Sequence, residues 1–377
     1  MTVITSVDTA TAVVPLDHAT AFSSRVVHER AYTLVRVTGD DGVHGIGFCY
    51  AGNRGGQLAG LAARDLLGPV LLGADAHLTE ASWAAMYQES LLHGRTGAVM
   101  RALSALDIAL WDRNARAAGL PLHRYLGGYA AESVPAYASG GYYLDGKTPG
   151  DLAEEMRGYV AAGFEAVKLK IGRLDLAADT KRLAAVREAV GPDVLVMLDA
   201  NNAWSDLPTA LRAMWRWRDY DPYWIEEPFS PDDIDNHRRL AEQTDVLVAT
   251  GEIEAGRWRF ADLVKQEAAA ILQTDAAVCG GISEFRRIAA TADSHGVTLC
   301  PHWFHDLHAP LVAATPNARY VEFFPDSQVL NFRRLVDRQL ETSGGRLMLH
   351  SEPGLGFGFD PEAVTKYSVD GWQRSNA

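Results

Sequence analysis

The sequence predicts an α/β protein in which a barrel of parallel strands follows a smaller α+β domain. Two observations support this fold class. Strand-like and then helix-like patterns fill the first 125 residues, and from about residue 133 short apolar runs alternate with amphipathic segments. Repeated βα units indicate a parallel sheet, and about eight of them indicate a closed TIM-type barrel. A chain of 377 residues is also long enough for two domains.

The first domain is expected to span residues 1–125. Strand patterns at 32–37 and 45–50 flank residues 39–42, Gly-Asp-Asp-Gly, which are typical of a hairpin turn. Helices are predicted over residues 57–72, 79–92 and 97–118, the last with apolar residues at helical spacing. This order of elements predicts an antiparallel sheet packed against helices.

The barrel is expected to span residues 126–330. Its strands are predicted at residues 134–138, 166–171, 194–199, 223–226, 246–250, 270–274, 297–301 and 319–323, with helices between them. The clearest is 194–199, because an uninterrupted apolar run is typical of a strand buried on both faces. The segment from about 331 to 377, which includes strand-like residues 346–349, is expected to complete the first domain.

Composition excludes several kinds of partner. The net charge is −13 and no run of Lys or Arg forms a basic stripe, which argues against nucleic acid or an anionic membrane. The three cysteines include no Cys-x-x-Cys pair, as is typical of a reducing compartment. Neither a signal-peptide layout nor an apolar run of about eighteen residues occurs. We therefore expect a cytoplasmic enzyme with a small-molecule substrate.

Polar residues end or follow the predicted barrel strands from the second strand onward. They are Lys168, Lys170, Asp199, Asn201, Glu226, Glu227, Glu252, Asp275, His302 and Glu322. Successive strand ends lie 20 to 29 residues apart, which is about one βα unit. Since the carboxyl ends of barrel strands meet at one face, these side chains are expected to converge there.

Asp199, Glu226 and Glu252 offer three carboxylates from three adjacent strands. Mg²⁺ binds a few carboxylates and keeps its other positions for water or substrate oxygens. This set of ligands does not suit zinc or copper, because it contains no Cys or His. Of Glu226 and Glu227, only one can point along the ligand direction, since successive side chains alternate. The alternative is that these carboxylates only cap helix N-termini or form salt bridges there.

Lys168 and Lys170 share one face of the predicted strand 166–171, and the apolar residues between and beside them face the helices. Two neighbouring ammonium groups repel each other, so at least one lysine is predicted to have a pKa lowered toward that of a usable base. The alternative is a pair of exposed lysines on an edge strand.

Asp275 and His302 end neighbouring strands. A carboxylate beside an imidazole fixes its tautomer and supports its charged form. A single histidine more often has a structural role, which is the interpretation for His295 and His308. The sequence contains no motif for a serine triad or for dinucleotide binding in the structural context that either would need.

Five motifs occur in order along the chain. They are residues 105–112 (Ala-Leu-Asp-Ile-Ala-Leu-Trp-Asp), Lys168-x-Lys170, Asp199-x-Asn201, Ile225-Glu226-Glu227-Pro228 and Thr250-Gly251-Glu252. Together they resemble the mandelate racemase subgroup of the enolase superfamily over essentially the whole length. The resemblance implies a capping domain over a modified (β/α)7β barrel, with Mg²⁺ on Asp199, Glu226 and Glu252.

The resemblance also implies removal of a proton next to a substrate carboxylate, through an ene-diolate. The implied roles are Lys170 as one base, Lys168 as its tuning group and carboxylate contact, His302 with Asp275 on the opposite face, Glu322 as hydrogen-bond partner of the ene-diolate, and Asn201 and Glu227 as supporting groups. Assembly as a homo-oligomer, from dimer to octamer, is also expected.

We expect a dehydratase that converts an acid sugar, an aldonate or aldarate, into a 2-keto-3-deoxy acid. The polar surroundings of His302, with Trp303 and His305, suit a polyhydroxylated substrate. Cap loops around His18 and Arg54 are expected to bind its distal end, although such loops can also be solvated turns.

Two other functions fit the same residues. A 2-hydroxy acid racemase, or a sugar-acid epimerase or cycloisomerase, would use the Lys170–His302 pair without loss of water. A binding protein for a metal or sugar acid would keep the fold without catalysis. A binding protein would bind its ligand without converting it, whereas either enzyme would form a product.

Overall fold

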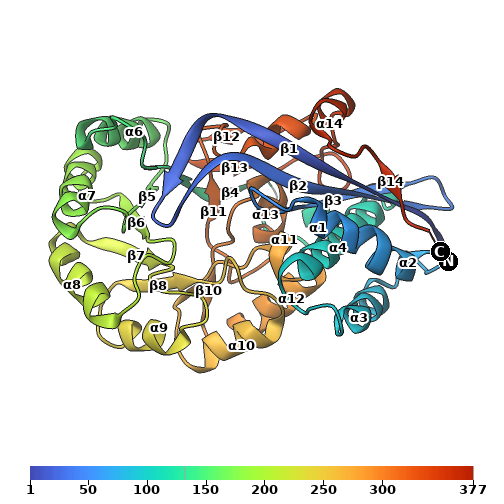
Figure 1. The fold of residues 1–377 in the computed structure, drawn as a ribbon, viewed down its shortest axis with the longest axis horizontal. Helices are drawn as coiled ribbons and strands as arrows, with labels where there is room; N and C mark the ends of the chain where they lie inside the picture. Colours follow the sequence, from blue (N-terminus) through green and yellow to red (C-terminus); the bar gives the residue numbers. More distant parts are fainter. Residues whose placement is uncertain (131, 377) are drawn as a thin grey trace.

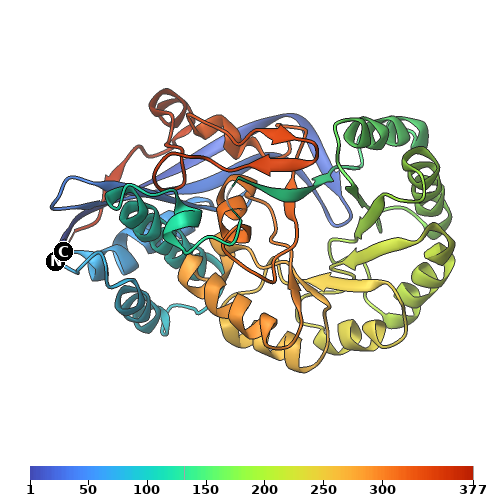
Figure 2. The same cartoon turned by 180° about the vertical axis from the view of Figure 1, so that it is seen from behind.

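The computed structural model describes residues 1–130 and 132–376. A ring of strands surrounded by helices lies beside a sheet that carries helices along one face (Figures 1 and 2). Both chain ends lie at the edge of this second unit that is farthest from the ring (Figure 1). The predicted α/β fold class, with an α+β capping domain beside a barrel domain, is confirmed.

The capping domain is built on an antiparallel sheet. Its strands in spatial order are β14 (Gln373–Arg374), β1 (Ile4–Phe22), β2 (Arg25–Gly39) and β3 (His44–Tyr50). Its helices are α1 (Gln57–Leu61), α2 (Gly68–Leu71), α3 (Thr79–Ser90), α4 (Gly97–Ala117) and α5 (Leu122–Tyr125). A π-helical segment at Ala62–Leu67 joins α1 to α2, so the helix predicted over 57–72 is not a regular α-helix.

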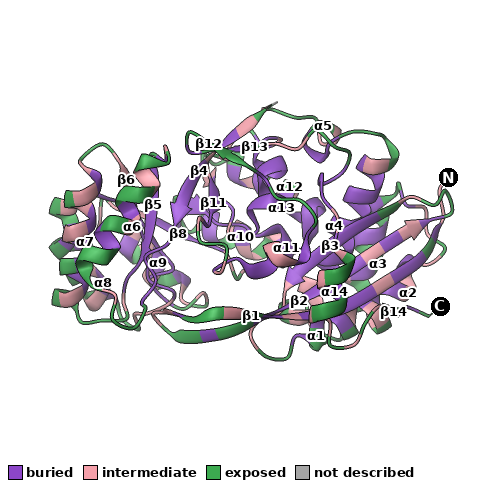
Figure 3. Ribbon diagram, turned by 90° about the horizontal axis from the view of Figure 1, so that it is seen from above, coloured by how far each residue is buried: buried purple, intermediate pink, exposed green. Residues whose placement is uncertain are grey.

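The barrel domain alternates strand and helix. Its strands are β4 (Ser133–Ser139), β5 (Ala166–Lys170), β6 (Leu195–Asp199), β7 (Pro222–Glu226), β8 (Leu247–Thr250), β9 (Ile271–Leu272), β10 (Thr298–Leu299) and β11 (Val321–Phe323). Its helices are α6 (Pro149–Ala161), α7 (Leu176–Val190), α8 (Leu207–Trp217), α9 (Ile234–Ala241), α10 (Arg257–Lys265), α11 (Ala276–Cys279), α12 (Gly281–Asp293) and α13 (His305–Val312), with a 3₁₀ turn at Arg218–Tyr220. Figure 3 shows the strands buried and the outward faces of α6, α7 and α8 exposed.

Parallel pairing runs from β4 to β10 in chain order, and β11 pairs with β4. The ladder is not continuous around the ring, because β10 meets the segment before β11 only through an isolated bridge between Leu299 and Ala318. Alternation along the strands separates two cores. One set of apolar side chains packs together inside the ring: Tyr137, Ala166, Met197, Trp224, Ala249, Ile271 and Cys300. The other set packs against the helices and includes Val167, Leu169, Val196 and Leu198.

The C-terminal segment contributes to both domains. It contains a 3₁₀ turn (Asn331–Leu335), β12 (Thr342–Ser343), β13 (Arg346–Met348), α14 (Pro361–Tyr367) and β14. β14 pairs with β1 in the capping domain, as the sequence predicts for the end of the chain. β13, however, pairs antiparallel with β4, so this strand extends the barrel sheet instead of the cap.

The β1–β2 hairpin reaches from the capping domain over the barrel (Figure 1). Its tip is fixed there by polar contacts, because the Ser23 hydroxyl donates to the Asn201 carbonyl at 3.1 Å and the Arg173 guanidinium donates to the Phe22 carbonyl at 3.1 Å. The capping domain therefore supplies side chains to the end of the barrel at which β5 and β6 terminate.

Two further predictions concern the whole chain. In the part of the chain that the structure describes, no helix is long and apolar enough to cross a membrane. Cys49, Cys279 and Cys300 are buried free thiols, as expected for a chain without a disulfide framework.

Close contact between β3 and α4 holds the capping sheet to its main helix. A Cβ atom at Gly47 would lie 1.8 Å from the Ala105 carbonyl oxygen, and one at Gly45 would lie 2.2 Å from the Ala109 carbonyl oxygen. Any side chain at either position would push α4 away from the sheet. This explains why two glycines stand in an otherwise well-packed strand.

We predict that Gly47→Ala lowers the melting temperature, because overpacking of this kind costs about 1–3 kcal/mol or more. Gly158→Ala is the matched control. Gly158 is exposed on α6 and nothing lies within 4 Å of a Cβ placed there, so alanine should leave stability unchanged or raise it by up to about 1 kcal/mol. Equal melting temperatures for Gly47→Ala and wild type would contradict the packing described.

Candidate active site and metal centre

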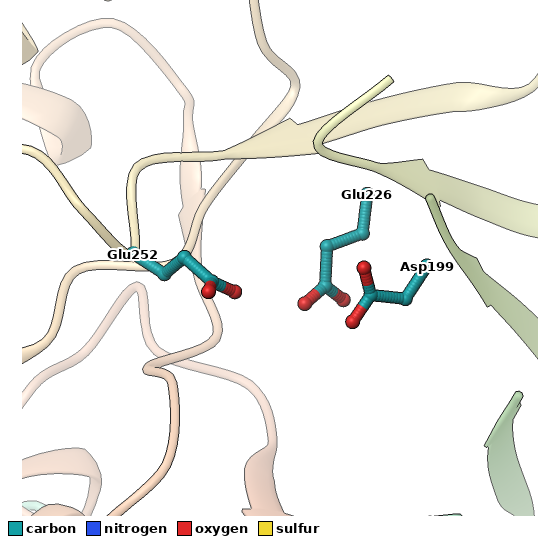
Figure 4. A group of neighbouring side chains, drawn as sticks. All are labelled: Asp199, Glu226 and Glu252. Atoms are coloured by element: carbon teal, nitrogen blue, oxygen red, sulfur yellow. The ribbon is translucent and has the colours of Figure 1, made fainter. Parts of the chain in front are cut away.

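Three carboxylates meet at the carboxyl ends of neighbouring strands. Asp199 and Glu226 are the last residues of β6 and β7, and Glu252 follows β8. One oxygen from each lies within 4.8 Å of the others, and the side chains point toward a common centre (Figure 4). Asp199 and Glu226 are buried, whereas Glu252 is partly exposed.

Strand register produces this convergence. Lys170 is opposite Asp199 in the β5–β6 pair, and Asp199 is opposite Glu226 in the β6–β7 pair. The three residues therefore stand at one level of the barrel, on the face that points into the ring. Lys168 lies two residues before Lys170 on the same face of β5, and it is opposite Met197.

The carboxylate cluster requires cations. Burial raises the pKa of Glu226, and the negative charge of Asp199 raises it further. Burial alone would also raise the pKa of Asp199, but the ammonium groups of Lys170 and Lys168 lower it to about 2. Hard oxygen ligands at this spacing fit a divalent cation such as Mg²⁺, which would relieve the repulsion between them.

Lys168 lies between two buried glutamates. Its Nζ is 2.7 Å from Glu226 Oε1 and 2.7 Å from Glu322 Oε1. The second Glu322 oxygen accepts a hydrogen bond from the Trp303 backbone N–H at 2.9 Å. Burial would raise the pKa of Glu322, but Lys168 and His302 lower it to about 2, so Glu322 is ionised in this arrangement.

The predicted low lysine pKa is wrong for the protein without a cation. Burial lowers the pKa of both Lys168 and Lys170, but the surrounding carboxylates outweigh this effect and raise both values. For Lys170 the main opposing charge is Asp199, with which it forms a short ion pair. The reason for the error is that repulsion between the two ammonium groups is weaker than their attraction to the cluster.

His302 is held by a buried carboxylate. Its Nδ1 lies 3.2 Å from Asp275 Oδ2, and its Nε2 lies 3.5 Å from Glu252 Oε1. Burial lowers the pKa of His302, but Glu252 and Asp275 raise it above the ordinary value overall. Asp275 also caps α11 and lies 3.4 Å from His308 Nε2, so its position is fixed from two sides.

A cavity of about 250 Å³ opens beside these groups, below the range of roughly 300–1,000 Å³ usual for drug-sized ligands. It is lined by Phe22, Ser24, Arg25, Arg30, Tyr50, Arg101, Tyr142, Lys170, Asn201, Asn202, Glu227, Glu252, Ile253, Asp275, Val278, His302 and Trp303. Its size suits a small molecule. A larger depression of about 790 Å³ lies at the other ends of β7 and β8, near Trp215, away from the carboxylates.

Several lining residues have strained backbones. The φ angles of Asn201, Glu227 and Trp303 are 43°, 42° and 73°. Asn202, the next residue after Asn201, also has a left-handed backbone, with a φ angle of 62°. Non-glycine residues rarely adopt this region, and such strain is concentrated at functional sites. Here the left-handed residues follow β6, β7 and β10, and they themselves line the cavity.

Three predicted substrate contacts do not line the cavity. His18 belongs to β1 and is exposed, and Arg54 lies in an exposed turn, so neither cap segment presents these side chains to the barrel mouth. His305 begins α13, which turns its ring into the core, 4.9 Å from the ring centre of Phe323. Burial lowers the pKa of His305 to about 4. Asn201 and Trp303 do line the cavity.

The lining residues that come from the capping domain and from the segment after the first barrel strand were not predicted. Tyr142 follows β4 as the other site residues follow their strands, so the rule of polar strand ends, applied to the first strand, would have found it. Its ring centre lies 5.2 Å from Lys170 Nζ. Phe22, Arg25, Arg30 and Arg101 have no such signal, because only the docking of the cap brings them to the barrel.

A capped barrel with a carboxylate cluster and a Lys/His pair at its strand ends defines a class of enzymes, and comparisons with known proteins identify the family. Residues 2–127 match the model of the mandelate racemase/muconate lactonizing enzyme N-terminal domain, and residues 151–363 match the enolase C-terminal domain-like model. The chain belongs to the enolase superfamily, in the mandelate racemase subgroup.

Individual relatives are acid-sugar enzymes of two kinds. The chain is 36% identical to L-talarate/galactarate dehydratase of Salmonella typhimurium strain LT2, over 89% of this chain and 82% of that protein. It is 34% identical to 3,6-anhydro-alpha-L-galactonate cycloisomerase of Streptomyces coelicolor, over 89% of this chain and 91% of that protein. The crystal structure of L-talarate dehydratase from Polaromonas sp. JS666, complexed with Mg and L-glucarate, superposes with a TM-score of 0.87 at 32% identity and full coverage of both chains.

We predict that Mg²⁺ raises the melting temperature of the wild-type protein and that Glu226→Gln removes most of this shift. A ligand present at about 100 times its dissociation constant stabilises by roughly 2.7 kcal/mol. Thermal unfolding in EDTA and in Mg²⁺ measures the difference. Glu188→Gln, on the exposed surface of α7, is the matched control and should keep the full shift. A Glu226→Gln protein that is stabilised as much as wild type would contradict the proposed ligand.

Proposed function

We propose that this protein is a Mg²⁺-dependent dehydratase that acts on an acid sugar and forms a 2-keto-3-deoxy acid. The observation that carries the proposal is that Lys170 and His302 line one small cavity beside the Asp199–Glu226–Glu252 cluster. The dehydratases among the relatives support this reaction class.

Lys170 is the proposed base. Its neutral amine takes the proton from the carbon next to the substrate carboxylate, and the C–H electron pair moves into the carboxylate to give an ene-diolate. A Mg²⁺ ion held by Asp199, Glu226 and Glu252 would supply positive charge beside the substrate carboxylate and offset the charge of Asp199, so that burial can lower the Lys170 pKa.

Lys168 and Glu322 are proposed to act on the charge that develops on the carboxylate. The Lys168 ammonium is buried and held between two glutamates, so it is positioned before the reaction and needs no reorganisation. Glu322 is fixed by Lys168 and by the Trp303 backbone N–H. A proton on Glu322 would allow it to donate a hydrogen bond to the ene-diolate.

His302 is the proposed acid for the second half of the reaction. The bond between the β-carbon and its hydroxyl oxygen breaks, the oxygen leaves with the electron pair, and the His302 proton converts it to water. The resulting enol tautomerises to the 2-keto acid. Asp275 supports the protonated imidazole through Nδ1, which leaves Nε2 to face the substrate.

A cycloisomerase or racemase is the second candidate, because relatives include cycloisomerases at similar identity. The same Lys170 would remove the proton. In a racemase His302 would return a proton to carbon, and in a cycloisomerase the substrate would form or open an internal C–O bond with no net loss of water.

A screen of acid sugars in Mg²⁺ with detection of 2-keto acids tests the proposed reaction. On the best substrate we predict that Lys170→Ala and His302→Asn each lower kcat/KM by about 10²–10⁴-fold, the usual contribution of a positioned acid or base. Lys265→Ala at the exposed end of α10 and His295→Asn in the exposed turn after α12 are matched controls and should keep wild-type rates. Unchanged rates in the first two variants would show that the bases are assigned wrongly.

Solvent deuterium separates the two candidate reactions. A dehydratase is predicted to yield a 2-keto-3-deoxy acid that carries deuterium from D₂O at the carbon that lost its hydroxyl. Deuterium in recovered substrate or in an isomer of equal mass, with no keto acid, would instead establish isomerisation. Binding of acid sugars without either product would favour a non-catalytic protein.

A further inference from the structure

Three arginines from the capping domain line the same cavity as the barrel carboxylates Glu227, Glu252 and Asp275. Arg25 and Arg30 belong to β2, and Arg101 belongs to α4. Among the residues that the structure describes, none of the three has an Asp or Glu partner within ion-pair distance. This is unusual in a chain with a net charge of −13, in which many other arginines are paired.

Arg30 is the most informative of the three because it is 3% exposed. Its Nε donates to the Val329 carbonyl at 3.0 Å and its Nη1 donates to the Tyr50 hydroxyl at 3.3 Å. The guanidinium also lies 4.6 Å from the ring centre of Trp303, the residue after His302. Its remaining nitrogen, Nη2, is buried without a hydrogen-bond partner. A buried cation with an unused donor is costly unless an anion completes its contacts.

Arg101 approaches the same wall of the cavity from α4. Its Nη1 donates to the Tyr50 carbonyl at 2.9 Å, so Tyr50 contacts both arginines, one through its hydroxyl and one through its backbone. Arg25 is exposed near the tip of the β1–β2 hairpin and lies at the rim. The hairpin contacts described above fix this tip on the barrel.

The two domains therefore contribute different charged groups to the cavity. The barrel provides Glu227, Glu252 and Asp275, together with Lys170, whereas the charged lining residues from the cap are arginines. A substrate carboxylate placed near the barrel lysines leaves the arginines facing the other end of a short molecule. Guanidinium groups bind carboxylates through charge-assisted hydrogen bonds, and an uncharged hydroxymethyl group would leave them unpaired.

We propose that Arg30 and Arg101, with Arg25 at the rim, form a second anion subsite that binds the distal carboxylate of a dicarboxylic sugar acid, so that the protein selects aldarates over aldonates. This inference rests on the proposed function, in which the substrate is an acid sugar, and it names which of the two acid-sugar classes the cavity takes. The two ends of the substrate are then bound by different domains.

Binding of matched pairs of sugars tests the subsite without turnover. Dissociation constants are measured by calorimetry in Mg²⁺ for galactarate against galactonate and for glucarate against gluconate, with Lys170→Ala as the reference protein. Members of a pair differ only at the distal carbon. For at least one pair we expect the dicarboxylate to bind about tenfold more tightly or better, since a hydrogen bond to a charged group contributes roughly that much.

Addition of Arg101→Met to the reference protein should bring that ratio close to one, mainly by weakening the dicarboxylate. Arg95→Met is the matched control, because Arg95 is exposed in the segment before α4 and does not line the cavity. Arg101→Lys keeps the charge but not the paired donors, and it should restore only part of the preference. Arg30→Gln is a second test if its buried position folds normally.

Equal affinity within both pairs, an unchanged ratio in Arg101→Met, or no binding of either dicarboxylate would overturn the subsite. Failure of the proposed function has a different signature. Wild-type protein would then form no 2-keto acid from any acid sugar, even if the dicarboxylate preference and its loss in Arg101→Met were observed.

Discussion

Repulsion among three carboxylates is the constraint on which this structure depends. Asp199, Glu226 and Glu252 bring their oxygens within 4.8 Å of one another at the end of a buried barrel. Lys168 and Lys170 offset part of this charge, and they do so by forming ion pairs with the same groups. In that arrangement Lys170 cannot act as a base. A divalent cation held by the three carboxylates would address both problems, because its charge would offset theirs and weaken the hold of Asp199 on the lysine.

Much of this arrangement follows from local sequence. Strand alternation places Lys168 and Lys170 on the inner face of β5, and parallel register places Lys170, Asp199 and Glu226 at one level. These are consequences of short-range periodicity and of the βα repeat, so they could be predicted. The same reasoning applied to β4 would have found Tyr142. The pairing of Asp275 with His302 also follows from neighbouring strand ends, and the structure brings the two together.

Other features depend on contacts between distant parts of the chain. The cap residues at the cavity include Phe22, Arg25, Arg30 and Arg101 but neither His18 nor Arg54, because hairpin docking decides which part of β1 and β2 reaches the barrel. The pairing of β13 with β4 and the direction of the lysine pKa shifts are likewise set by three-dimensional surroundings. His305 lies only three residues after His302, yet the start of α13 turns it into the core. Assembly into a homo-oligomer stays a prediction.

These contacts determine which groups each domain contributes to the site. The barrel supplies the carboxylates, both lysines and His302, and the cap supplies the arginines and aromatic groups that close the cavity. Anomalous diffraction from crystals grown with Mn²⁺ as a substitute for Mg²⁺ tests most directly whether the three carboxylates hold a divalent cation. We expect one strong peak at about 2.1 Å from oxygens of Asp199, Glu226 and Glu252. A fully occupied Mn²⁺ site elsewhere, with these three carboxylates binding no ion, would contradict it.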